Sequence, residues 1–70
     1  MEVADRLRRI RTEQRYTQED IADILQMTQQ QYSRYELGIH EIPVRHVITL
    51  CKFYGISSDW LLGLDGSSTD

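Results

Sequence analysis

Four hydrogen-bonding side chains, none of them a carboxylate, share one face of a predicted helix near the middle of the chain. Turning successive residues by about 100° places this face opposite Tyr32 and Tyr35. It carries Gln29, Gln30, Ser33 and Arg34. A glutamine amide can pair with N6 and N7 of adenine, and an arginine can pair with O6 and N7 of guanine. These residue types therefore suit the reading of base edges in duplex DNA, whereas a face that is merely solvated is the simpler alternative.

Other reactive side chains are too few or too scattered to indicate catalysis. Cys51 is the only cysteine, so neither a disulfide framework nor a thiolate metal cluster is expected, and its place on an apolar face favours a core residue. His40 and His46 have no carboxylate partner at metal-ligand spacing, and no glycine-rich phosphate-binding loop occurs. We therefore expect no enzyme activity, no cofactor and no bound metal.

Length and charge set further limits. With 70 residues the chain is one domain at most, and no apolar run approaches membrane-spanning length. Its start has neither a basic leader nor an apolar stretch, which favours the reducing cytoplasm. The net charge of −3 is unusual for a protein that binds DNA, although arginines crowd the first predicted helix. The composition therefore predicts modest non-specific affinity for DNA.

Hydrophobic periodicity and capping residues predict five helices and no strand. The first helix covers about residues 3–14, and its stripe consists of Val3, Leu7, Ile10 and Gln14. Thr17 and Thr28, 11 residues apart, each begin a further helix as its N-cap, and Gly38 ends the second of these. Two short helices joined by such a tight turn form a helix-turn-helix, with the small Ala22 where they cross.

The last two helices are expected from about Pro43 to Gly55 and over residues 58–62. The buried face of the longer one is expected to consist of Val44, Val47, Ile48, Cys51 and Tyr54. This arrangement leaves Phe53 facing away, and Trp60 follows in a helix with little room to bury it. Phe53 and Trp60 are therefore candidates for a dimer interface, and the alternative is that the two rings pack on each other within one chain.

Residues 17–38 resemble the helix-turn-helix family of the Cro/C1-repressor type, whose pattern is approximately T-Q-x-x-L-A-x-x-L-G-V-S-x-x-x-I-S-x-W-E-x-G. The resemblance rests on residues at matching spacings, namely Thr17, Gln18, Ala22, Tyr35, Glu36 and Gly38. Residues 53–63 are similar to the common family ending F-F-x-V-S-x-D-Y-L-L-G. The resemblance covers residues 3–64 and implies an all-α, compact five-helix, lambda-repressor-like DNA-binding domain over residues 1–64, before a flexible tail at residues 65–70.

The family also implies roles for matching residues. Arg11 would pair with Glu36 and tie the first helix to the third, because a half-buried charge needs a partner; a surface Arg11 that touches phosphate is the alternative. Gln26 stands where the family usually has glycine, which costs about 1 kcal/mol if its backbone is left-handed. The family implies a phosphate contact for Gln18. Independently of the family, Thr17, Gln31, His40 and Arg45 are further candidates for phosphate contacts.

These residues together predict a sequence-specific, double-stranded-DNA-binding transcriptional regulator. We expect a repressor of a bacterial, phage or mobile-element operator, associated with the nucleoid in the bacterial cytoplasm. A homodimer on a palindromic operator is expected, since two recognition helices about 34 Å apart read both half-sites. The alternative is an antitoxin subunit or scaffold that uses this fold to bind a protein partner, and the polar face of the third helix favours DNA over that role.

Overall fold

The computed structural model describes residues 2–64, and this part of the chain is entirely helical. Its helices are α1 (Val3–Glu13), α2 (Gln18–Ile24), α3 (Gln29–Glu36), α4 (Val44–Tyr54) and α5 (Ser58–Leu62). The predicted all-α, five-helix class is therefore confirmed. The flexible tail predicted for residues 65–70 lies outside the described residues. Over the described range, none of the helices is long and apolar enough to cross a membrane.

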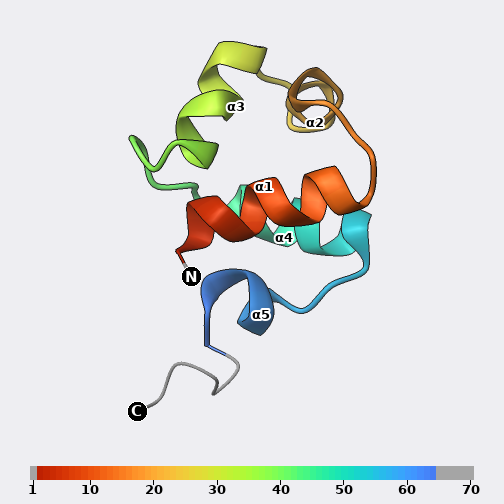
Figure 1. Cartoon of the computed structure of the whole chain (residues 1–70), viewed down its shortest axis with the longest axis vertical. Helices are drawn as coiled ribbons and strands as arrows, with labels where there is room; N and C mark the ends of the chain where they lie inside the picture. The colour runs from red at the N-terminus through yellow and green to blue at the C-terminus, as the bar shows by residue number, and fades with distance from the viewer. Residues whose placement is uncertain (1, 65–70) are drawn as a thin grey trace.

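Helix α1 crosses the middle of the molecule (Figure 1). Helices α2 and α3 lie on one side of it and α5 on the other, while α4 passes behind α1 in this view (Figure 1). The α2–α3 pair is in extensive contact, and α1 packs against both α3 and α5. Helix α1 is therefore the element that joins the helix-turn-helix to the end of the fold.

The hydrophobic core draws on all five helices. Its buried members are Leu7, Ile21, Ala22, Leu25, Tyr32, Val47, Leu50, Cys51 and Leu61. Ala22 is 1 % exposed, as expected for a small residue at the crossing of α2 and α3. Each fully buried leucine contributes roughly 1.5–3 kcal/mol of transfer free energy. Because one residue of the short α5, Leu61, is completely buried, this helix belongs to the core and is not an appendage.

The buried face of α4 differs from the prediction. Val44 and Ile48 were expected inside, yet they are 69 % and 48 % exposed. The helix instead buries Val47, Leu50 and Cys51, with Tyr54 partly buried. This stripe is centred between Val47 and Tyr54, so that Val44 and Ile48 lie about 70° and 110° to one side of it. The prediction was wrong because it omitted Leu50 and so rotated the face.

The stripe of α1 also needs a correction. Leu7 and Ile10 are buried as expected, but Gln14 is exposed because it caps a helix that ends at Glu13. The buried polar residue on α1 is Arg6, whose guanidinium donates a hydrogen bond to the main-chain oxygen of Trp60. The same guanidinium lies 5.1 Å from the centroid of the Trp60 ring. Arg6 thus attaches α5 to α1 by a hydrogen bond and a cation–π contact.

Two helices end with a left-handed residue that is not glycine. Gln26 after α2 has φ of 59°, which confirms the left-handed turn considered from the sequence, and Arg15 after α1 has φ of 67°. At the end of α2 the amide of Met27 donates to the carbonyl of Ala22 at 2.9 Å, which is the Schellman arrangement. These turns redirect the chain sharply, and each carries about 1–2 kcal/mol of left-handed strain.

Candidate nucleic-acid interface

Helix α3 starts from a reciprocal cap. The Thr28 side chain accepts from the amide of Gln31 at 3.1 Å, and the Gln31 side chain accepts from the amide of Thr28 at 3.1 Å. The same capping box, made by Thr17 and Asp20, begins α2. These caps satisfy amides that a helix start leaves without partners, and they define where α3 begins. Gln31, a phosphate candidate in the sequence analysis, is therefore a capping residue in the structure.

The outer face of α3 has the polarity predicted from the sequence. Gln29, Gln30 and Arg34 are exposed, and Ser33 is half-buried. The acid of this helix, Glu36, is 4 % exposed and so does not contribute to the face. The structure thus places the four candidate base-reading residues together on a surface of donors and acceptors that carries no carboxylate.

Glu36 is held beneath this face by an ion pair with Arg11 of α1. The Arg11 Nε donates to Glu36 Oε2 at 2.7 Å, and its Nη2 donates to Oε1 at 3.1 Å. The third guanidinium nitrogen donates to the main-chain oxygen of Tyr16 at 2.9 Å. Burial by itself would raise the pKa of Glu36, but the hydrogen bond from Arg11 lowers it below the ordinary value, with smaller contributions from Tyr32 and Gln18. The hydrogen bond to Glu36 raises the pKa of Arg11, so the pair stays ionised.

The ion pair continues to the protein surface through two glutamines. Gln18 Nε2 donates to Glu36 Oε1 at 3.0 Å, and Gln29 Nε2 donates to Gln18 Oε1 at 2.6 Å. Gln18, which was assigned to a phosphate, is thus hydrogen-bonded to Gln29, which was assigned to a base. Sequence reasoning missed this link, although both glutamines directly follow a threonine N-cap, which places them at equivalent positions of neighbouring helices.

Beside α3 lies a hollow of about 510 Å³ whose walls include four basic side chains and no carboxylate. The basic residues are Arg34, His40, Arg45 and His46. Burial and the charge of Arg45 lower the pKa of His46. The structure thus brings three candidate phosphate contacts, Gln31, His40 and Arg45, next to the base-reading candidate Arg34. The charges of Arg34 and Arg45 would favour an anionic ligand here.

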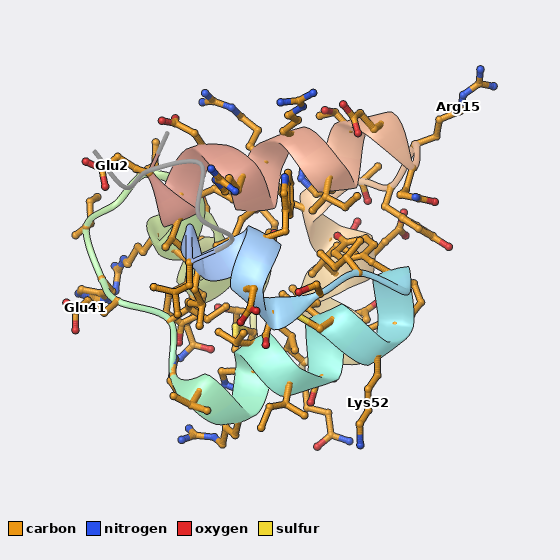
Figure 2. All side chains as sticks on the ribbon, turned by 90° about the horizontal axis from the view of Figure 1, so that it is seen from below. Glu2, Arg15, Glu41 and Lys52 are labelled. Carbon is orange, nitrogen blue, oxygen red and sulfur yellow. The ribbon has the colours of Figure 1, made fainter. Side chains whose placement is uncertain are left out.

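The arginines of α1 make a smaller basic surface than their number suggests. Arg8 lies 3.4 Å from Asp5, and Arg9 lies 2.9 Å from Glu13. Arg6 is buried, whereas Arg15 extends away from the end of α1 (Figure 2). Beside the polar face of α3, positive charge comes from Arg34 of α3 itself and from Arg45 at the start of α4.

A second depression lies at the start of α2, where candidate phosphate contacts were expected. Thr17 and Gln18 line it together with Arg11 and Gln29. The same depression contains the acid Glu19. An anion approaching Gln18 would therefore meet hydrogen-bond donors and one opposing charge.

The two aromatic candidates for a dimer interface have separate partners. Phe53 is 39 % exposed, and its ring centroid lies 5.1 Å from that of Tyr16 and 5.2 Å from that of Tyr54. Trp60 is partly buried beneath Arg6. The ring of Phe53 thus lies against Tyr16 and Tyr54, whereas the ring of Trp60 lies against Arg6. Of the two rings, that of Phe53 is the more exposed to solvent.

Potential catalytic or metal-binding groups are dispersed over the described residues. Between residues 2 and 64 no three residues of the types His, Cys, Asp and Glu are grouped so that they could hold a metal ion. Cys51 is a buried core residue, as expected, and burial raises the pKa of its thiol.

Two capped helices joined by a left-handed turn, with a polar outer face on the second, define a helix-turn-helix protein. Residues 7–61 match the family described as Helix-turn-helix, and the chain belongs to this family, in its Cro/C1-repressor type. The resemblance noted in the sequence is thereby confirmed.

The chain is similar to two proteins of Bacillus subtilis (strain 168). It is 38 % identical over 58 residues to the SPbeta prophage-derived HTH-type transcriptional regulator YonR. This match covers 83 % of the chain and 54 % of that protein. It is 32 % identical over 59 residues to the HTH-type transcriptional regulator YqaE. This match covers 84 % of the chain and 51 % of that protein. The chain thus spans about half the length of these relatives.

Solved structures share the fold. One is the P22 c2 repressor in complex with synthetic operator 9T, with a TM-score of 0.82, 22 % identity, and coverage of 93 % of this chain and 98 % of that one. Another is a transcriptional regulator from Listeria innocua, with a TM-score of 0.86 and 22 % identity. The match covers 99 % of this chain and 64 % of that one. Their similarity supports the lambda-repressor-like arrangement of the helices.

Proposed function

We propose that the chain is a sequence-specific, double-stranded-DNA-binding domain of a transcriptional regulator, with α3 as its recognition helix. The observation that carries the proposal is the exposed, carboxylate-free outer face of α3 above a buried Glu36. A helix with such a face fits the major groove, where its N-terminal residues reach base edges. The names of the two relatives and the operator complex of the P22 c2 repressor support the same assignment.

The proposed contacts divide into two groups. Gln29, Gln30, Ser33 and Arg34 read bases from α3. The phosphate contacts are assigned to Thr17, Gln18, Gln31, His40 and Arg45. Thr17 and Gln18 lie at the start of α2, where the first-turn amides that the capping box does not engage favour an anion. His40 and Arg45 lie in the basic hollow beside α3. The phosphate-contacting residues thus lie beside the base-reading residues. This arrangement is required when one protein surface contacts both a DNA groove and the phosphates along its edge.

We further propose that the working unit is a homodimer on a palindromic operator, acting as a repressor on the nucleoid in the bacterial cytoplasm. The 39 % exposure of Phe53 supports an interface at the end of α4. Trp60 contributes less, because Arg6 and the core already cover part of its ring. A single domain reads only a few base pairs, and two copies read both halves of a site.

Selection from a random pool of DNA duplexes tests the proposal. The wild-type chain should enrich one motif, while the triple variant Gln29→Ala/Gln30→Ala/Arg34→Ala should enrich none. Single changes at Gln30 or Arg34 should each cost about 1–3 kcal/mol on the best site and relax preference at one base pair. Lys52→Ala on α4 is the charge-matched control and should leave the motif unchanged. An unaltered motif in the triple variant, or no enrichment by the wild type, would refute the assignment.

Sedimentation tests the dimer. The wild-type chain should sediment as a dimer at high micromolar concentration, and Phe53→Ala should dissociate it more than Trp60→Ala does. A wild-type monomer that also binds a palindromic site in single copy would rule out the dimer.

A further inference from the structure

The hydrogen bonds that run from Glu36 to Gln29 have a fixed direction. An ionised carboxylate can only accept, so the Gln18 atom that faces Glu36 Oε1 must be the donor Nε2. The Gln18 amide then presents its Oε1 to the neighbouring helix, and the Gln29 atom that faces it must in turn be Nε2. Glu36 thus determines the orientation of both amides.

The direction of these bonds limits what Gln29 can offer to a ligand. A glutamine amide has two N–H donors and one carbonyl acceptor. One donor of Gln29 is engaged by Gln18 at 2.6 Å, which leaves one N–H and the carbonyl oxygen. Rotating the amide by 180° would bring two carbonyl oxygens together at that contact. The free pattern is therefore one donor beside one acceptor.

We propose that Glu36 is a specificity-determining residue that does not touch DNA: through Gln18 it holds Gln29 in the orientation that accepts adenine and rejects guanine. The inference rests on the proposed function, in which Gln29 reads a base. Adenine presents an acceptor at N7 and a donor at N6, which match the free N–H and carbonyl of Gln29. Glu36 acts as a positioning residue, with Gln18 as the intermediate.

Guanine is rejected because both of its major-groove atoms, N7 and O6, are acceptors. An untethered glutamine can direct both of its N–H groups toward these two atoms. Gln29 has only one N–H left, so its carbonyl oxygen would face O6 without an intervening hydrogen. Discrimination between the two purines therefore depends on the bond to Gln18 and not on the Gln29 side chain alone.

The first test measures the ratio of affinities for adenine and guanine at the base pair assigned to Gln29. The pair is located as the position where Gln29→Met loses its preference. The wild-type chain should favour adenine there by about tenfold or more. In Gln18→Met, Gln29 keeps its side chain but loses its acceptor partner, and the ratio should fall by about tenfold. Because the ratio is internal to each variant, loss of the Gln18 phosphate contact cancels.

A second variant examines Glu36 itself. The double change Arg11→Met/Glu36→Met removes the ion pair without leaving a buried charge, so the fold should be retained. Its adenine-to-guanine ratio should fall as in Gln18→Met, whereas the control Lys52→Ala should keep the wild-type ratio. Should the double variant fail to fold, Glu36→Gln takes its place: a glutamine can turn either its oxygen or its N–H group toward Gln18, so the ratio should again fall.

The outcomes separate the two proposals. If the wild-type chain enriches no motif, the proposed function fails. If it enriches a motif but Gln18→Met retains the full adenine preference, or the Gln29 position prefers another base, base reading stands and the role of Glu36 is overturned. A uniform loss of affinity with an unchanged ratio would mark Gln18 and Glu36 as structural or phosphate-binding residues only.

Discussion

Removing either partner of the Arg11–Glu36 ion pair should destabilise the fold strongly, since the two side chains are only 13 % and 2 % exposed. Breaking a buried pair leaves an unpaired charge and costs about 3–5 kcal/mol. A 70-residue domain has a free energy of unfolding of about 4–10 kcal/mol. Arg11→Ala should cost more than Glu36→Ala at pH 7, because it strands the deeper group and also removes the donor to the Tyr16 carbonyl.

The pH dependence of the two variants should differ. In Arg11→Ala the burial of Glu36 is no longer opposed by the guanidinium, so its pKa should rise above the ordinary 4.5. A raised folded-state pKa means that protonation relieves the penalty, and this variant should regain stability as the pH falls from 7 toward 4.5. Glu36→Ala has no carboxylate to protonate and should not recover. In the wild type the pKa of Glu36 is lowered, so its contribution is lost only as the pH falls below 4.5.

Urea unfolding followed by circular dichroism measures these differences at pH 7, 6 and 5. The exposed pair Arg9–Glu13, at 2.9 Å, is the matched control. Glu13→Ala should cost no more than about 1 kcal/mol at any of these values. Arg11→Ala and Glu36→Ala variants that unfold within about 1 kcal/mol of the wild type would refute the reasoning, and so would equal pH dependence of the two.

Three further outcomes are expected. Gln26→Gly should raise the melting temperature, because relief of about 1–2 kcal/mol of strain at φ of 59° exceeds the cost of a more flexible unfolded chain. The control Gln14→Gly, at a residue with φ of −88°, should lower the melting temperature. Arg45→Ala should reduce the slope of log affinity against log salt by about 0.9 while the selected DNA motif stays the same, and a changed motif would contradict its assignment to a phosphate. Glu19→Gln should tighten DNA binding by about 0.3–1 kcal/mol in low salt, because this acid lines the depression assigned to a phosphate; weaker binding would contradict that placement.

The helix-turn-helix could be predicted from the sequence because its signals are local. Thr17 and Thr28 cap helices within three residues of themselves, Gly38 follows the C-cap of α3, and Gly55 is the C-cap of α4. Periodicity within α3 separated the buried Tyr32 from the exposed face. Each of these features is set within one helix, and each could be read without knowing what the helix packs against.

Features that depend on packing between helices were predicted less well. The predicted face of α4 was rotated because Leu50 was omitted, and the exposed Val44 and Ile48 are as apolar in sequence as the buried Val47. The burial of Arg6 requires the carbonyl and ring of Trp60, a residue 54 positions away. The direction of the hydrogen bonds from Glu36 to Gln29 likewise requires two helices, α2 and α3, in register. Such contacts are three-dimensional, and spacing along the chain does not encode them.

Arg6 and Arg11 give α1 a polar attachment at each end of its path through the molecule. Arg6 holds the backbone of α5 and Arg11 holds the acid of α3, about 7.5 Å apart along one helix axis. Because hydrogen bonds are more directional than apolar contacts, we expect shifts of α3 and α5 to be coupled through α1. Backbone amides of α3 and α5 should therefore exchange hydrogen with solvent as one cooperative unit. A partner that binds α5 would then slow hydrogen exchange in α3, although α3 lies on the opposite side of α1 (Figure 1).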